Sequence, residues 1–177
     1  PSGPFTKLNS SVDDITVYSD FVGSNNQTFY YSVAAVSNAA VESYQPPVVW
    51  AETFAMTDNQ LLSSIQQATV RYFWDFAHPV SGMARERSDA WDRDTVTTGG
   101  SGFGIMAILV GVERGWIDRD QAAAHILKIA SFLEDTAPRY HGIWSHWMNG
   151  NTGQPIAFDY DSYGNPVICG DLVESSF

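Results

Sequence analysis

The sequence has little cysteine and no long hydrophobic run. A single cysteine, Cys169, stands among 177 residues, which excludes a disulfide framework. Because no histidine is near Cys169 in the sequence, we expect it to be a small buried apolar residue. No run reaches the about 18 consecutive apolar residues that a membrane span requires, so we expect no membrane span.

Basic residues are also scarce. Nine Lys and Arg face 20 Asp and Glu, and the formal net charge is −11. Binding of nucleic acid or of an anionic membrane surface needs a basic face, so we expect neither partner. An acidic chain fits a protein that acts on a neutral polymer, although it fits any soluble protein equally well.

Aromatic residues, in contrast, are abundant. They make up 14% of the chain, with six Trp and eight Tyr, and hydrophobic residues in total make up 44%, as in ordinary globular proteins. Sugar-binding clefts use flat apolar rings, because the C–H faces of pyranoses pack on them. Filling of a hydrophobic core explains the same rings equally well.

The first part of the chain is predicted to be β-structure. Residues 15–18 and 29–36 are rich in β-branched and aromatic side chains and predict strands, with a turn at 23–26. A third extended segment ends at Pro46 and Pro47, which cannot continue a ladder. Three strands are too few for a stable sandwich.

The second part is predicted to be mainly helical. Thr57 and Gln60 have capping-box spacing, and apolar residues then recur at helical spacing through residues 61–76. A second helix is expected over residues 101–114, after the glycine-rich entry 97–100, and a third over 118–135. Residues 143–148 and 156–160 predict a hairpin, and a fourth helix is expected to start near residue 170.

These elements do not complete a core. Three amphipathic helices and three strands cannot each close a hydrophobic core by themselves. The sequence shows no signal-peptide pattern and begins at Pro1 and not at Met, so we expect a processed chain or an excerpt. We therefore expect an interior fragment, cut through a domain at both ends, with the missing helices of the second domain as its partner.

Candidate binding residues gather where the helices meet long loops. Arg85 and Arg87 follow the first helix, and their guanidinium groups can hold a sugar hydroxyl or a carboxylate. Asp94, like its neighbours Asp89 and Asp92, can accept hydrogen bonds from hydroxyls. A solvated charged loop and ordinary turn chemistry remain open as explanations of these residues.

An aromatic cluster lies between residues 141 and 150. Trp144 and Trp147 can form a platform for a sugar, with His146 and Asn149 as partners for its hydroxyls. A packed hairpin without function is the alternative. His141 and His146 have no acidic residue between them, so a zinc site is disfavoured.

Two further patterns concern catalysis. The glycine-rich segment 97–104 lacks the Lys-Ser/Thr ending of a phosphate-binding loop, so we expect no nucleotide and no other cofactor. Glu174, at the expected start of the fourth helix, is the candidate catalytic acid, because glycoside hydrolysis needs a protonated carboxyl. A simple capping box made by Asp171 and Glu174 is the alternative.

The chain from about residue 62 resembles the family called putative glucoamylases, which includes the β-1,2-glucanases of glycoside hydrolase family 144. Residues before 49 resemble the last strands of a fibronectin type III domain, with Asp20, Asn25 and Asn26 in family positions and Phe29 in place of the corner tyrosine. The glucoamylase resemblance is carried by Val70-Arg-Tyr-Phe-Trp-Asp-Phe76, Gly82-Met-Ala-Arg-Glu-Arg87, Val96-Thr-Thr-Gly-Gly-Ser-Gly-Phe-Gly-Ile-Met106, Glu113-Arg-Gly-Trp116, His141-Gly-Ile-Trp-Ser-His-Trp-Met-Asn-Gly150 and Asp171-Leu-Val-Glu-Ser-Ser-Phe177.

This resemblance implies a mainly α fold in which residues 49–177 form the N-terminal part of an (α/α)6 toroid, preceded in 1–48 by part of a β-sandwich. It implies an inverting, secreted or periplasmic glycoside hydrolase that acts on a neutral glucan, with β-1,2-glucan as the candidate substrate. Glu174 would be the acid, and the substrate contacts would be Arg85, Arg87, Asp94, Trp144, His146 and Trp147. A non-catalytic glycan-binding protein and a polysaccharide lyase on the same helical scaffold remain open.

Overall fold

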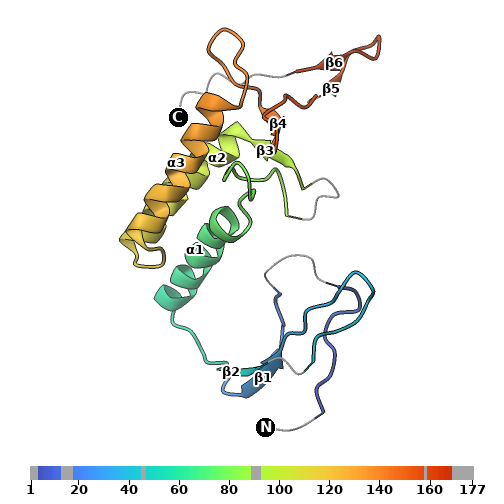
Figure 1. Ribbon diagram of the computed structural model, residues 1–177. Helices are drawn as coiled ribbons and strands as arrows, with labels where there is room; N and C mark the ends of the chain where they lie inside the picture. The colour runs from blue at the N-terminus through green and yellow to red at the C-terminus, as the bar shows by residue number, and fades with distance from the viewer. Residues whose placement is uncertain (1–3, 13–17, 45–46, 89–92, 158, 169–177) are drawn as a thin grey trace. The chain divides into compact units, whose positions relative to one another are not determined.

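A computed structural model describes residues 4–12, 18–44, 47–88, 93–157 and 159–168 (Figure 1). Contacts divide the chain into two compact units, residues 1–62 and 63–177, and each is described by itself. The predicted domain boundary at residues 48–49 stays a prediction.

The first unit contains one small antiparallel sheet. Strand β1, Thr28–Ser32, pairs with strand β2, Val48–Glu52, with Tyr30 opposite Trp50. The strand predicted over 29–36 is thus shorter than expected, and β2 was not predicted, because the two prolines before it were interpreted as the end of all pairing. A proline just ahead of a strand is compatible with the ladder that follows. The strand predicted at 15–18 lies outside the described residues, except for Tyr18.

Helix α1, Asp58–Asp75, begins in the first unit and continues into the second. Its predicted capping box is confirmed: the Thr57 amide donates to Gln60 Oε1 over 2.9 Å, and the Gln60 amide donates to Thr57 Oγ1 over 3.3 Å. Two amide groups at the helix start that lack helical partners are thereby satisfied.

Helices α2, Thr98–Glu113, and α3, Arg119–Asp135, follow in the second unit. The predicted start of α2 at residue 101 is wrong by three residues, because Thr97 is the N-cap and its Oγ1 accepts from the Gly100 amide over 3.0 Å. A Cβ on Gly100 would lie 2.4 Å from that oxygen, so glycine is required inside the first turn. The predicted start of α3 is confirmed, with Asp118 Oδ1 accepting from the amides of Asp120 and Gln121.

A small ribbon lies beside these helices. Strand β3, Thr95–Thr97, pairs antiparallel with strand β4, Trp147–Asn149, so that Val96 faces Met148. The predicted hairpin of 143–148 with 156–160 is wrong in extent. The chain reverses after β4, and Met148 bridges to Pro155, whereas β5, Asp159–Tyr160, pairs with β6, Pro166–Val167.

Two hydrophobic clusters hold the second unit together. One joins the ribbon to α3, and the other joins the three helices through Val70, Ile108, Ile117 and Ala122. The cluster under the ribbon consists of Met83, Val96, Ile129, Phe132, Ala137 and Met148. No helix among the described residues is long and apolar enough to span a membrane.

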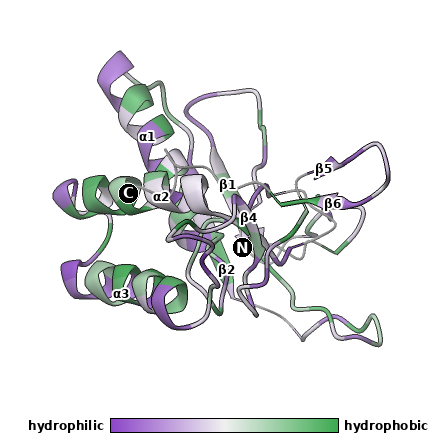
Figure 2. Ribbon diagram, turned by 90° about the horizontal axis from the view of Figure 1, so that it is seen from above, coloured by the Kyte–Doolittle hydropathy of each residue, from purple (hydrophilic) through white to green (hydrophobic). Residues whose placement is uncertain are grey.

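Helix α2 is apolar on more than the face that packs. It carries no charged residue from Thr98 to Val112, and Figure 2 shows hydrophobic residues along it. Phe103, Met106 and Leu109 are 63%, 57% and 56% exposed in this chain, although Ile108 is 1% exposed. Helices that are hydrophobic all round are normally buried within a larger core.

Candidate functional site

Strand β3 is the centre around which the candidate residues gather. On one side it pairs with β4, and on the other the Glu86 amide donates to the Thr95 carbonyl over 3.1 Å and the Thr97 amide donates to the Ala84 carbonyl over 3.0 Å. Side chains alternate across such a ribbon. Val96 and Met148, both fully buried, mark its inner face.

Arg85 bridges to Val96 and therefore projects toward this inner face. Its Nε is buried and has no hydrogen-bond partner among the described residues. Its carbonyl accepts from the Tyr72 hydroxyl over 2.9 Å, which fixes the backbone. A buried guanidinium donor without a partner is costly, and a polar group brought by a ligand would satisfy it.

Glu86 is a functional candidate that the sequence did not single out. Its side chain is 22% exposed and forms an ion pair with Arg87, with Arg87 Nη2 2.9 Å from Glu86 Oε1. This bond and the charges of Arg87 and His146 lower the pKa of Glu86, although burial opposes them. An ionised carboxylate accepts hydrogen bonds from hydroxyls and cannot act as a proton donor. Alternation of charge in Arg-Glu-Arg was the only signal in the sequence.

The predicted aromatic platform is divided. Trp144 is committed to packing, because its Nε1 donates to the Leu133 carbonyl over 3.1 Å and the Arg139 guanidinium lies 5.2 Å from its ring centre. His146 and Trp147 are half-buried, with ring centres 6.0 Å apart. Trp147 is the first residue of β4 and His146 directly precedes it, whereas Trp144 anchors the segment to the end of α3.

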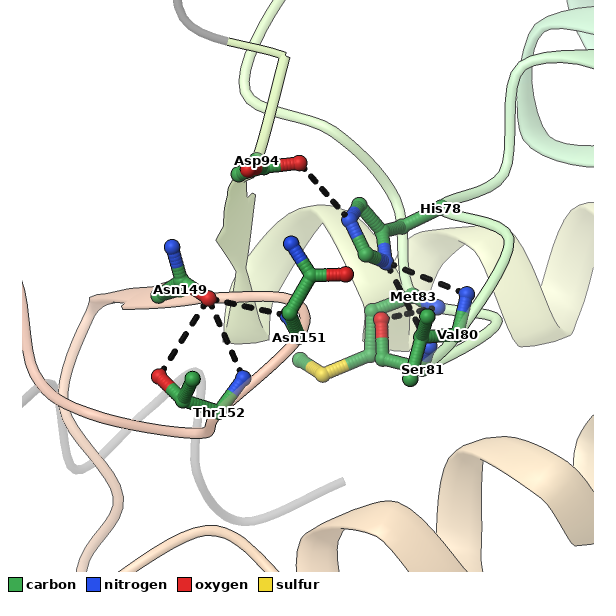
Figure 3. Close-up of polar contacts among 8 residues, drawn as sticks. All are labelled: His78, Val80, Ser81, Met83, Asp94, Asn149, Asn151 and Thr152. Atoms are coloured by element: carbon green, nitrogen blue, oxygen red, sulfur yellow. Dashed lines mark hydrogen bonds and ion pairs between the residues drawn. The ribbon is translucent and has the colours of Figure 1, made fainter.

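Asn149 acts inside the turn that follows β4. Its Oδ1 accepts from the amides of Asn151, over 2.9 Å, and Thr152, over 3.1 Å (Figure 3). This Asx turn brings Gly150 against the loop that follows α1, and the Gly150 amide donates to the Asp94 carbonyl over 2.7 Å. Asn149 therefore fixes the backbone of the turn that contains Gly150.

His78 is a second functional candidate that the sequence does not single out. Its side chain is 1% exposed. Figure 3 shows its ring between the Val80–Ser81 turn and the Asp94 carboxylate, with Nε2 3.3 Å from Asp94 Oδ1. A Cβ on Gly150 would lie 2.6 Å from the ring, so the two chain segments pack in direct contact.

Burial lowers the pKa of His78, and the charges of Arg85 and Lys128 act in the same direction, whereas the bond to Asp94 opposes them. An imidazole has a pKa of about 6.5 in the unfolded chain, so the unfolded state binds more protons than the folded state below that pH. The contribution of His78 to the free energy of unfolding is therefore expected to be complete above pH 6.5 and to be lost as the pH drops through 6.5 toward the folded pKa.

Urea unfolding at pH 5, 6, 7 and 8 measures this effect. The midpoint is expected to fall between pH 7 and pH 5, and to fall less in His78→Gln, which removes the titrating group. The lowered pKa of Glu86 acts below its ordinary value of 4.5 and so outside this window. An equal fall in the wild type and in His78→Gln would contradict the assignment.

Other predicted residues lie outside the described residues. These are Glu174 and Asp171, together with Asp89, Asp92 and Cys169. The role of Glu174 as the acid therefore stays a prediction. Within the part of the chain that the structure describes, no three His, Cys, Asp or Glu side chains gather as a metal site requires.

Comparison with known proteins finds relatives named for action on β-1,2-linked glucans, together with putative glucoamylases. No family model matches the chain. An exo β-1,2-glucooligosaccharide sophorohydrolase (non-reducing end) from Parabacteroides distasonis is 47% identical over 160 residues, which are 90% of this chain and 21% of that protein. The chain thus spans about a fifth of the length of this relative.

Solved structures of β-1,2-glucanases and putative glucoamylases are also similar to this chain. A β-1,2-glucanase from Parabacteroides distasonis matches with a TM-score of 0.77 and 46% identity, over 89% of this chain and 22% of that one. An endo-β-1,2-glucanase from Chitinophaga pinensis, solved with sophorotriose and glucose, matches with a TM-score of 0.59 and 44% identity, over 69% and 29%. A putative glucoamylase from Bacteroides uniformis matches with a TM-score of 0.61 and 50% identity, over 68% and 28%.

Proposed function

We propose that this chain, a homologue of part of the β-1,2-glucanases and putative glucoamylases, belongs to a glycoside hydrolase that cleaves β-1,2-linked glucan. One observation carries the proposal: 46% identity and a TM-score of 0.77 to a β-1,2-glucanase over 89% of the chain. The named relatives include an exo-acting and an endo-acting enzyme. Both are named for β-1,2-linked glucans. We therefore propose the β-1,2 linkage and leave the choice between exo and endo cleavage out of the proposal.

The groups around β3 have the chemistry that a neutral sugar requires. Glu86 and Asp94 offer carboxylate acceptors, and Arg85 and Arg87 offer guanidinium donors, for hydroxyl groups. Trp147 and His146 offer half-buried rings. In this proposal Arg85, Arg87, Asp94, His146 and Trp147 contact the substrate, and Trp144 supports them from the end of α3.

The proposed reaction is inverting hydrolysis, with Glu174 as the general acid. Such enzymes place an acid and a base about 6.5–9.5 Å apart, so that a water molecule fits between the base and the sugar. The lowered pKa of Glu86 makes it unsuitable as the acid. The first-formed anomer of the product, followed by proton NMR, tests the stereochemistry, because retention would exclude an inverting mechanism.

We propose that further helices of the same domain complete the core and the site. The exposed Phe103, Met106 and Leu109 on α2 support this, because a helix so apolar is stable only when it is covered. An (α/α)6 toroid would provide that cover. Residues 1–48 would belong to a fibronectin-like sandwich, and the lower coverage of this chain by the glucoamylase match, 68% against 89%, supports a chain of two parts.

A secreted or periplasmic location is part of the same proposal. An enzyme outside the cytoplasm would meet an external glucan polymer before the polymer is shortened. Fractionation of the source cells, with an antibody against this chain, tests the location. Recovery in the cytoplasmic fraction alone would contradict it.

The proposed function predicts a simple assay result. The protein that carries this chain together with the remaining helices is expected to release reducing sugar from β-1,2-glucan. It is expected to act much more slowly on β-1,3- and β-1,4-glucans, because hydroxyl contacts that fit one linkage are left unpaired by another. Residues 1–177 alone are expected to be inactive. Binding of β-1,2-glucan without any product would instead indicate a non-catalytic protein, and a product that absorbs as an unsaturated sugar would indicate a lyase.

A further inference from the structure

The hydrogen bonds of His78 define its protonation. The amides of Val80 and Ser81 donate to Nδ1 over 3.3 and 3.4 Å, so Nδ1 is an acceptor and carries no proton. The proton of the neutral ring therefore lies on Nε2. The interaction of this nitrogen with Asp94 Oδ1, over 3.3 Å, is then a hydrogen bond donated by the histidine.

Asp94 is held from two directions, although its side chain is 53% exposed. Its carbonyl accepts from the Gly150 amide over 2.7 Å, and its carboxylate accepts from His78. Gly150 and His78 are themselves packed against each other, since no Cβ fits between them. The result is a solvent-facing carboxylate on a rigid base at the start of β3.

We propose that His78 is a positioning residue, which holds the Asp94 carboxylate in the orientation that accepts a hydrogen bond from a hydroxyl group of the glucan. This inference rests on the proposed function. Because the ring is buried, its Nε2–H needs an acceptor in any role, and for loop stability alone a backbone carbonyl would serve. Instead, the remaining donor of a fully buried ring is given to a half-exposed carboxylate, and this is the arrangement by which enzymes fix polar groups before substrate binds.

Two substitutions separate the two functions of the ring. The amide oxygen of asparagine reaches about as far as Nδ1, so His78→Asn keeps an acceptor for Val80 and Ser81 but loses the donor to Asp94. The amide nitrogen of glutamine reaches about as far as Nε2, so His78→Gln keeps the donor. His125→Asn is the matched control, because His125 bonds the Gly82 carbonyl over 2.8 Å.

Positioning predicts a change in KM. His78→Asn is expected to raise KM for β-1,2-glucooligosaccharides about tenfold, because one hydrogen-bonding group of the substrate loses its oriented partner, and to change kcat by less than about twofold. His78→Gln is expected to raise KM less than His78→Asn. His125→Asn is expected to leave KM unchanged. Asp94→Asn should raise KM as much as His78→Asn, and the double variant His78→Asn/Asp94→Asn no further.

A merely structural His78 would lower the fraction of folded enzyme, and so the apparent kcat, at constant KM. Equal KM values for His78→Asn and His78→Gln, additive effects of His78 and Asp94, or no effect of Asp94→Asn on KM would each overturn the proposal. All of these outcomes presuppose a wild type that cleaves β-1,2-glucan.

A second measurement tests the proposal without an activity assay. If the wild type does not cleave β-1,2-glucan, the proposed function fails, and imidazole ¹⁵N NMR of histidine-labelled protein still tests His78. The expected spectrum shows the Nε2–H tautomer and a shift of that signal in Asp94→Asn. A proton on Nδ1, or a signal unchanged in Asp94→Asn, overturns the inference.

Discussion

Glu174→Gln is expected to lower kcat on β-1,2-glucan by about 10²–10⁴-fold, the usual contribution of a general acid. Glycosidic bonds break when the leaving oxygen receives a proton, and an amide of the same shape cannot supply it. Because glutamine preserves size and can still occupy a helix-capping position, the melting temperature is expected to change little. Steady-state kinetics together with thermal unfolding measure both effects.

The design of this test separates catalysis from capping. Glu113→Gln, at the exposed end of α2, is the control and should keep the activity of the wild type. A substrate with an acidic aryl leaving group needs little protonation, so Glu174→Gln should retain far more activity on it than on the glucan. Near-normal turnover of β-1,2-glucan by Glu174→Gln would reject the role of this residue. A loss of activity that follows a loss of folded protein would support the capping role instead.

Met148→Ala is expected to lower the free energy of unfolding by about 2–5 kcal/mol, as buried Met→Ala changes do. Met148 is fully buried in the cluster under the ribbon, opposite Val96 and bridged to Pro155. Truncation would open a cavity where β3, β4 and α3 meet. Urea unfolding measures this difference in free energy, provided that the slope of free energy against urea concentration is the same in both proteins.

Two control substitutions test this prediction. Met148→Leu nearly conserves the volume and is expected to cost less than about 1.5 kcal/mol. Met56→Ala removes a methionine that is 45% exposed and should stay within about 0.5 kcal/mol of the wild type. If Met148→Ala lowered the free energy of unfolding by less than Met148→Leu, the ribbon would not depend on this cluster.

Local signals predicted the helices well. The caps at Thr57 and Asp118 depend on residues two or three positions apart, and both are present. The glycines of α2 misled the prediction of its start, because Gly100 is required by contact with Thr97 and does not mark a loop. Propensity alone does not reveal such a contact.

The ribbon could not be predicted, because its pairing is not local. Strand β3 has three residues and pairs with a strand far along the chain. Nothing close to His78 in sequence shows that Gly150 will pack on its ring or that Asp94 will accept a hydrogen bond from it. Arg85, Arg87 and Asp94 were predicted from residue type alone, whereas Glu86 and His78 became candidates only through their burial and partners.

The most direct test of the proposed function uses the protein that carries this chain together with the remaining helices of its domain. This protein is incubated with purified β-1,2-glucan, and the products are separated by chromatography. We expect short β-1,2-linked glucooligosaccharides, each with a new reducing end, and little product from β-1,3- or β-1,4-glucan. Absence of any product from β-1,2-glucan, with cleavage of another glucan by the same protein, would contradict it.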